Sequence, residues 1–186
     1  MRMKKKYLIG FFAACLLSTG MLPAQTVVSD TLKFVFKLHG QTRRYQVVFC
    51  EQGDRLQMNW GIERNMHWQS GSYTMTPKGL ESGSQLCFLQ PEDGNHLQLS
   101  DAETVYVVSQ KALKQLKETG SMDFNHTIYD RAEDASEKNA GRPLLHVVDR
   151  YEGGEMWIWD NPSLPIIWRM ANNPLEVNWQ VELMKK

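Results

Sequence analysis

Residues 31–38 alternate between apolar and polar side chains along the sequence. Because successive side chains of a strand point to opposite faces, this pattern predicts a strand with one apolar face, made by Leu32, Phe34, Phe36 and Leu38. Two more alternating segments follow, after turns expected at residues 39–42 and 51–54. A register that pairs Phe36 with Tyr45 and Phe49 with Leu56 keeps the apolar face continuous, since a slip of one residue would reverse every side chain.

Further strands are expected between clusters of glycine, proline, asparagine and aspartate. They cover residues 71–76, 85–89, 96–99, 144–151, 156–159, 164–170 and 175–183. The alternation in the last segment has no fault and predicts five inward side chains, Leu175, Val177, Trp179, Val181 and Leu183. The sequence therefore predicts a mainly β meander, an antiparallel curved sheet that forms a half-barrel or a sandwich.

One short packing helix is expected to interrupt the β pattern. Ser109 is a suitable N-cap, residues 110–119 are mostly strong helix formers, and Gly120 is a suitable terminator. Leu113 and Leu116 form a narrow apolar stripe that we expect to lie against the sheet.

Residues 130–142 contain no large apolar side chain, and we interpret them as a mobile surface loop. The carboxylates in this segment invite comparison with a calcium-binding loop. They lack the ligand spacing and the central glycine that such a loop needs, so we expect no metal there.

The N-terminus has the three-part layout of a secretory signal, with basic residues, an apolar run at residues 7–17, and small or polar residues. The apolar run has about half of the roughly 20 residues that a membrane-spanning helix needs, so we expect no transmembrane anchor. Cleavage after Ala24 would divide the chain into a signal peptide, residues 1–24, and a single β-rich domain, residues 25–186. The alternative is a lipoprotein acylated at Cys15.

The lysine-rich leader looks bacterial, which places the mature domain in the periplasm or cell envelope of a Gram-negative bacterium. Its removal leaves 17 Lys and Arg against 21 Asp and Glu, a net charge of about −4. Nucleic-acid binding is driven by a concentrated basic face, and no basic stripe is visible in the sequence. We therefore expect no nucleic-acid partner.

Cys50 and Cys87 are the two cysteines of the mature domain, in a compartment where disulfides persist. A bridge between them would close a loop of roughly 38 residues and contribute about 4 kcal/mol in the chain-entropy model. Both cysteines are out of phase with their apolar neighbours, so both thiols are expected to face away from the main core. Two separate free thiols remain the alternative.

No catalytic or cofactor motif is recognisable in the sequence. The five histidines are scattered singly, and neither a nucleophile elbow nor a phosphate-binding glycine loop is present. We therefore expect a protein that is not an enzyme and that carries no cofactor or metal. A hydrolase assembled from distant residues, with His146 near Asp149, is the alternative.

Six tryptophans, all in the mature domain, are the unusual feature of the composition. Trp157 and Trp159 share one face of a predicted strand, and Met156 and Ile158 make its other face apolar as well. With Trp168 they are candidate ligand-binding residues, since neighbouring indoles can form a stacking platform for a sugar or the wall of an apolar pocket. The alternative is that these rings fill the core.

A C-terminal pattern contains these tryptophans. It reads LLHVV at residues 144–148, EMWIWDNP at residues 155–162 and LPIIWRM at residues 164–170. It resembles the C-terminal signature of certain exported bacterial families of unknown function, which are similar in fold to the open half-barrels of the lipoprotein-localisation carriers. Trp168 and Arg169 depart from the aliphatic form of this pattern. The resemblance, over the last third of the chain, implies a curved sheet that wraps a helix and can hold an acyl chain, without catalytic residues.

Two functions are therefore expected. The first is a periplasmic, non-enzymatic protein whose concave apolar face binds a lipid or another apolar small molecule. The alternative is a carbohydrate- or partner-binding module that uses the tryptophan platform.

Overall fold

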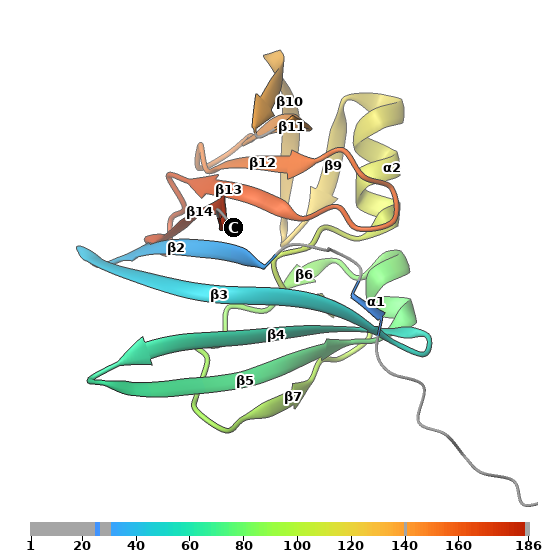
Figure 1. The fold of residues 1–186 in the computed structure, drawn as a ribbon. Helices are drawn as coiled ribbons and strands as arrows, with labels where there is room; N and C mark the ends of the chain where they lie inside the picture. Colours follow the sequence, from blue (N-terminus) through green and yellow to red (C-terminus); the bar gives the residue numbers. More distant parts are fainter. Residues whose placement is uncertain (1–24, 27–30, 140, 185–186) are drawn as a thin grey trace, which may run out of the picture.

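A large open sheet of twelve strands forms most of the molecule (Figure 1). The computed structural model describes residues 25–26, 31–139 and 141–184, so the expected signal peptide and Cys15 lie outside the described residues. The strands lie side by side in the order β7-β5-β4-β3-β2-β14-β13-β12-β11-β10-β9, and β1 pairs with β3. The edge strands β7 and β9 are not paired with each other, so the sheet is open.

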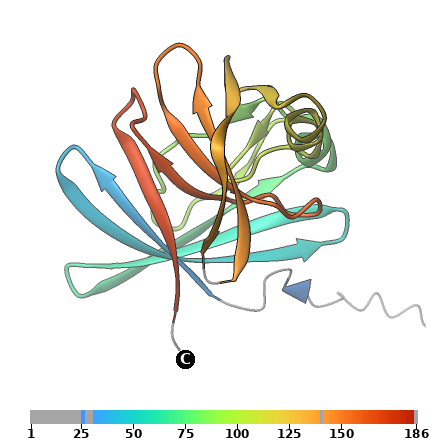
Figure 2. The ribbon, with the colours of Figure 1, turned by 90° about the horizontal axis from the view of Figure 1, so that it is seen from above.

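The strands of this sheet are β1 (Gln25–Thr26), β2 (Leu32–Leu38), β3 (Gln41–Gln52), β4 (Arg55–Arg64), β5 (His67–Met75), β7 (His96–Gln98), β9 (Ser121–Phe124), β10 (Thr127–Asn139), β11 (Arg142–Asp149), β12 (Glu155–Trp159), β13 (Ile167–Ala171) and β14 (Val177–Leu183). Neighbouring strands are antiparallel, except that β5 and β7 are parallel. Figure 2 shows the strong curvature of the sheet. The predicted mainly β fold, an antiparallel curved sheet, is confirmed.

The first three strands pair in a register two residues away from the predicted one. Tyr45 lies opposite Phe34, and Phe49 lies opposite Met58. A shift of two residues preserves the face of every side chain, because the side-chain period of a strand is two. The predicted inward side chains therefore still point inward. The four residues of these two pairs, Phe34, Tyr45, Phe49 and Met58, are all buried.

Short turns explain the shift in register. His39 and Gly40 have φ angles of 44° and 81°, as the two-residue turns that suit a twisted hairpin require, and the second turn has Gly53 at a φ of 63°. Each hairpin thus closes with two turn residues where the sequence predicts four. One consequence is that Arg43 lies opposite Phe36, on the inner face.

The segment between β5 and the predicted helix at residues 110–119 does not form the predicted meander. It contains a second helix that the sequence analysis missed, α1 (Pro77–Ser82), and a separate pair of parallel strands, β6 (Gln85–Leu86) and β8 (Glu103–Thr104). The missed helix carries standard start signals, since Thr76 Oγ1 accepts a hydrogen bond from Gly79 N and a proline occupies the first turn. The long connection that includes α1 allows β7 to return parallel to β5.

The helix α2 (Gln110–Thr119) confirms the prediction from the sequence. Ser109 is its N-cap and accepts a hydrogen bond from Ala112 N, and Gly120 ends it in the left-handed conformation. The buried side chains of α2 are Ala112, Leu113 and Leu116, and the helix packs against β9 and α1.

The predicted mobile loop at residues 130–142 is instead part of a β-hairpin. β10 pairs with β11 from Tyr129 opposite Asp149 to Asn139 opposite Arg142, with an irregularity between Arg131 and Ser136. The hairpin projects from the top of the molecule in Figure 1. Polar composition misleads here because backbone pairing with β11 holds the strand, so an apolar face along its whole length is not needed.

The core lies between the inner face of the sheet and a layer formed by α1, α2 and the segment 105–108. In that segment Val105, Val107 and Val108 are at most 1% exposed, and Val107 forms a β-bridge with Ile166. Figure 2, in which α2 is seen along its axis, shows this layer on one side of the curved sheet. The buried apolar residues form one continuous cluster.

The last strand is shorter than predicted. Trp179 and Val181 are 3% exposed, as expected for inward residues, whereas Leu175 is 58% exposed. Leu175 lies in the turn before β14, where Asn172 and Glu176 adopt positive φ angles and the chain is not extended. Its inward prediction is therefore wrong.

Candidate functional site

Trp157 does not form the exposed platform that the sequence suggested. The ring is 7% exposed and is stacked on His146 from β11, with ring centroids 4.1 Å apart and an interplanar angle of 7°. From the opposite neighbour, β13, the Arg169 guanidinium lies 4.2 Å from the centroid of the same ring. Both faces of the indole are covered by protein, so neither is free to stack on a sugar.

Trp159 and Trp168 pack on each other edge to face, with ring centroids 6.4 Å apart. Arg142 lies over both rings, and Trp168 is 1% exposed. The indole Nε1 of Trp168 is buried without a hydrogen-bond partner among the described residues. Trp157 and Trp168, but not Trp159, line a hollow of about 300 Å³ that Glu182 and Gln180 also line. The structure thus packs the rings of all three predicted residues against other side chains, Trp157 in one group and Trp159 with Trp168 in another.

His146 contacts a carboxylate, but not the one that the sequence suggested. Its Nε2 is 2.8 Å from Glu155 Oε2, whereas Asp149 Oδ1 accepts hydrogen bonds from Thr127 Oγ1 and from the Tyr151 backbone N–H. The imidazole is also stacked on Trp157. Neither His146 nor Glu155 lines the hollow beside Trp157.

Cys50 and Cys87 are free thiols, so the bridge that their even count allows is not formed. Cys50 is partly exposed on the outer side of β3, where Asn59 Nδ2 lies 3.7 Å from its Sγ. Cys87 is 5% exposed within the core, and burial raises the pKa of its thiol. The expectation that both thiols face away from the core is therefore wrong for Cys87, and the sheet separates the two cysteines.

A cavity of about 310 Å³ lies on the concave side of the sheet, at the end where β2 turns into β3. This volume is near the lower end of the roughly 300–1,000 Å³ that small-molecule sites occupy. The lining is mostly apolar and aromatic, and includes Phe36, Leu38, Tyr45, Phe88, Leu89, Tyr106 and Val177. We name it the hairpin cavity.

Aromatic rings form the inner wall of the hairpin cavity. Phe36 packs edge to face on Tyr45, with centroids 5.4 Å apart, and lies 5.5 Å from Tyr106. The Tyr106 ring also packs on the rings of Trp179 and Phe34, with centroids 5.3 and 5.0 Å apart. Such pairs have defined preferred geometries, so the wall is a fixed surface.

Tyr106 is held in a strained conformation at this wall. Its φ is 55°, in a region that costs an ordinary residue about 1–3 kcal/mol. The hydrogen bond from Ile167 N to Tyr106 O, 2.8 Å long, fixes the segment against β13. Burial raises the pKa of the Tyr106 hydroxyl, so the ring presents a neutral phenol. Strain of this kind persists where the surroundings fix the residue, and it is frequent at ligand sites.

A short loop covers one side of the hairpin cavity. Residues 87–91 all line it, and the loop is anchored by Tyr73, whose hydroxyl donates to Leu89 O at 2.9 Å. The Leu89 side chain itself is 61% exposed. The cover is therefore fixed at its backbone, while its apolar side chains lie at the surface and at the cavity.

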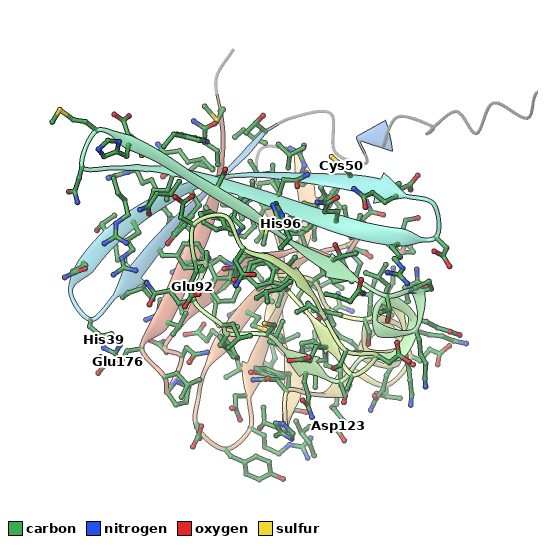
Figure 3. The ribbon with its side chains drawn as sticks, turned by 90° about the horizontal axis from the view of Figure 1, so that it is seen from below. His39, Cys50, Glu92, His96, Asp123 and Glu176 are labelled. Atoms are coloured by element: carbon green, nitrogen blue, oxygen red, sulfur yellow. The ribbon has the colours of Figure 1, made fainter. Side chains whose placement is uncertain are left out.

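The open rim of the hairpin cavity is polar. His39, Gln41, Arg43 and Gln90 line it. His39 Nδ1 lies 2.8 Å from Glu176 Oε2, and Figure 3 shows these two side chains together at the end of the hairpins, far from Cys50. The arrangement combines an aromatic interior with a few polar groups at the mouth, as is typical of small-molecule sites.

Sequence reasoning missed this site, although one signal for it was present. Arg43 has the same parity as Tyr45, which the alternation already assigned to the inner face. A charged residue at an inward position was therefore detectable. The loop at residues 87–91 was not detectable, because its first three residues were interpreted as the end of a strand at residues 85–89.

No protein-family model, no curated protein and no solved structure matches this chain. Within the described ranges, no helix has the length and apolar character to cross a membrane. The same residues contain no cluster of side chains that could hold a metal ion.

Proposed function

We propose that this protein is an exported, non-enzymatic carrier or sensor that binds a lipid or another apolar small molecule in the hairpin cavity. The cavity is the single observation on which the proposal rests: about 310 Å³, lined mostly by apolar and aromatic side chains, on the concave side of the sheet. Its wall is made largely of rings that are already buried, including Phe36 and Tyr45 at 4% and 5% exposure. Apolar burial supplies the affinity of such a site, at about 25 cal/mol per Å².

The expected export of the protein supports a ligand that is found in the bacterial cell envelope. The leader at residues 1–24 has the pattern of a secretory signal, and the periplasm is the compartment in which apolar molecules must be shielded between two membranes. The resemblance of residues 144–170 to exported families with open half-barrels is consistent with the open curved sheet. The proposal gives no chemical step to the protein.

The test is a titration of the mature protein with the neutral fluorescent probe N-phenyl-1-naphthylamine. Val177 lines the hairpin cavity, so Val177→Trp should fill it and weaken binding by about tenfold or more, which equals about 1.4 kcal/mol or more. Leu175→Trp is the matched control, because Leu175 is 58% exposed in the preceding turn and does not line the cavity.

The proposal predicts saturable binding by the wild type and by Leu175→Trp, and weak binding by Val177→Trp with an unchanged thermal midpoint. A wild type that does not bind the probe would count against it. So would equal affinity of a folded Val177→Trp variant, which would place the probe elsewhere.

A further inference from the structure

Arg43 occupies an inward position of β3 at the polar rim of the hairpin cavity. Its register partner on β2 is Phe36, and Tyr45 continues the same face two residues later. The next residue, Arg44, points to the opposite face and is exposed. One guanidinium of this pair thus lies on the concave, aromatic side of the sheet, where arginine is uncommon.

One nitrogen of this guanidinium has no partner. Arg43 Nη1 is buried and makes no hydrogen bond to any of the described residues, and Nη2 reaches Gln41 Oε1 only at 3.4 Å, which is too long for a strong bond. A buried donor left without an acceptor costs about 1–3 kcal/mol, and more when the group is charged. Each such group in a native structure calls for an explanation, and an acceptor supplied by a ligand at the rim is one.

The charges around the rim favour an anion. No carboxylate is among the residues that line the hairpin cavity. Glu176 forms an ion pair with the lining residue His39, and both of these side chains are more than two-thirds exposed. Among the described residues Arg43 forms no salt bridge, although Glu63 lines a second hollow with it.

We propose, on the basis of the proposed function, that the ligand is an anionic amphiphile whose head accepts hydrogen bonds from Arg43. A carboxylate head and a phosphate head both fit this site, since each presents oxygens that can accept two hydrogen bonds from a planar guanidinium. The apolar tail then lies against Phe36, Tyr45 and Tyr106. The head stays at the open rim, where water reaches its remaining oxygens.

The experiment compares three ligands that share one tail: decanoate, decyl phosphate and decanol, titrated by calorimetry near neutral pH at concentrations below micelle formation. Wild type should bind at least one of the two anions about tenfold more tightly than the alcohol. The affinities for decanoate and decyl phosphate are then compared: tighter binding of decanoate indicates a fatty acid as the ligand, and tighter binding of decyl phosphate indicates a lipid with a phosphate head.

Arg43→Gln should weaken the binding of the preferred anion far more than the binding of decanol, and so remove the preference for the anion. Arg44→Gln is the matched control, because it removes the same charge from the neighbouring outward position. That variant should keep the preference. A cooperative thermal transition with the midpoint of the wild type shows that the Arg43→Gln variant is still folded.

The outcomes separate the two proposals. If wild type binds decanol and the anions equally, or if the anion preference survives Arg43→Gln or is lost equally in Arg44→Gln, the role of Arg43 is wrong and the apolar site stands. If none of the three ligands binds, the hairpin cavity is not a ligand site and the proposed function fails with it.

Discussion

Individual residues on the inner face show how tightly the concave side is packed. Gly71 lies on β5, and a Cβ added there would be 2.3 Å from Asn95 O and 2.9 Å from the Trp60 ring. The contact with Asn95 is made by backbone, which also accepts a hydrogen bond from Ser72 N at 3.0 Å. A side chain at this position cannot be accommodated by a rotamer change alone.

Gly71→Ala is therefore expected to destabilise the fold by about 1–3 kcal/mol, the usual cost of overpacking. The measurement is urea unfolding followed by tryptophan fluorescence. Gly154→Ala is the control, because a Cβ there meets its nearest atoms at ordinary contact distances of 3.6 Å and no positive φ is required. The control should remain within about 1 kcal/mol of wild type; equal effects of the two substitutions would show that the close approach of Asn95 is not the cause.

At the scale of single residues, parity predicted the inner face well. The alternation assigned the correct face to every inward residue of the first hairpins, because burial selects apolar side chains at every second position. It could not give the register, since two turn residues at positive φ and four at ordinary angles fit the same pattern. The pairing of Arg43 with Phe36 therefore needed the structure.

At the scale of elements, one polar network joins β9, β10 and the turn that follows β11, at the β9 edge of the sheet. Asp130 on β10 accepts hydrogen bonds from Arg150 Nε and Nη2, at 2.8 and 2.6 Å, and from Ser121 Oγ on β9. The hydrogen bonds from Arg150 lower the pKa of Asp130 from 3.8 to about 2. The group is solvent-exposed, so its energetic contribution is small.

A lowered folded-state pKa gives the sign of the pH dependence. The stabilisation by Asp130 is fully present above its ordinary pKa of 3.8 and is lost as the pH falls through about 2. Asp130→Asn should therefore be less stable than wild type near pH 5, and the difference in unfolding free energy should shrink as the pH falls towards 2. Urea titrations at several acidic pH values provide the measurement.

Asp123→Asn is the control for this network, because Asp123 is an exposed residue of β9 outside the ion pairs of the described residues. Its difference from wild type should change little over the same pH range. A constant gap between Asp130→Asn and wild type would contradict the assignment of the lowered pKa.

Elements with strong local signals were predicted, and elements that depend on distant partners were not. α2 has a cap, good helix formers and a terminal glycine, so its bounds followed from the sequence. β10 has no apolar periodicity in its second half and exists through pairing with β11. β7 pairs in parallel with β5, a choice that no local pattern specifies.

At the scale of the whole molecule, the open sheet and the loop at residues 87–91 enclose an aromatic cavity at the hairpin end. The sequence predicted a concave apolar face, but it placed the ligand on Trp157, Trp159 and Trp168. Those rings pack with Arg169, His146 and Arg142 instead. Composition identifies aromatic residues, whereas only the packing of their neighbours determines whether a ring has a free face.

The most direct test of the central claim is native mass spectrometry of the protein purified without detergent from the envelope of its host. The account predicts an adduct with the mass of an amphiphile on the wild type, and its loss from the folded Val177→Trp variant, in which the cavity that Val177 lines is filled. Bare protein alone in repeated preparations of the wild type, or the same adduct on both proteins, would contradict it.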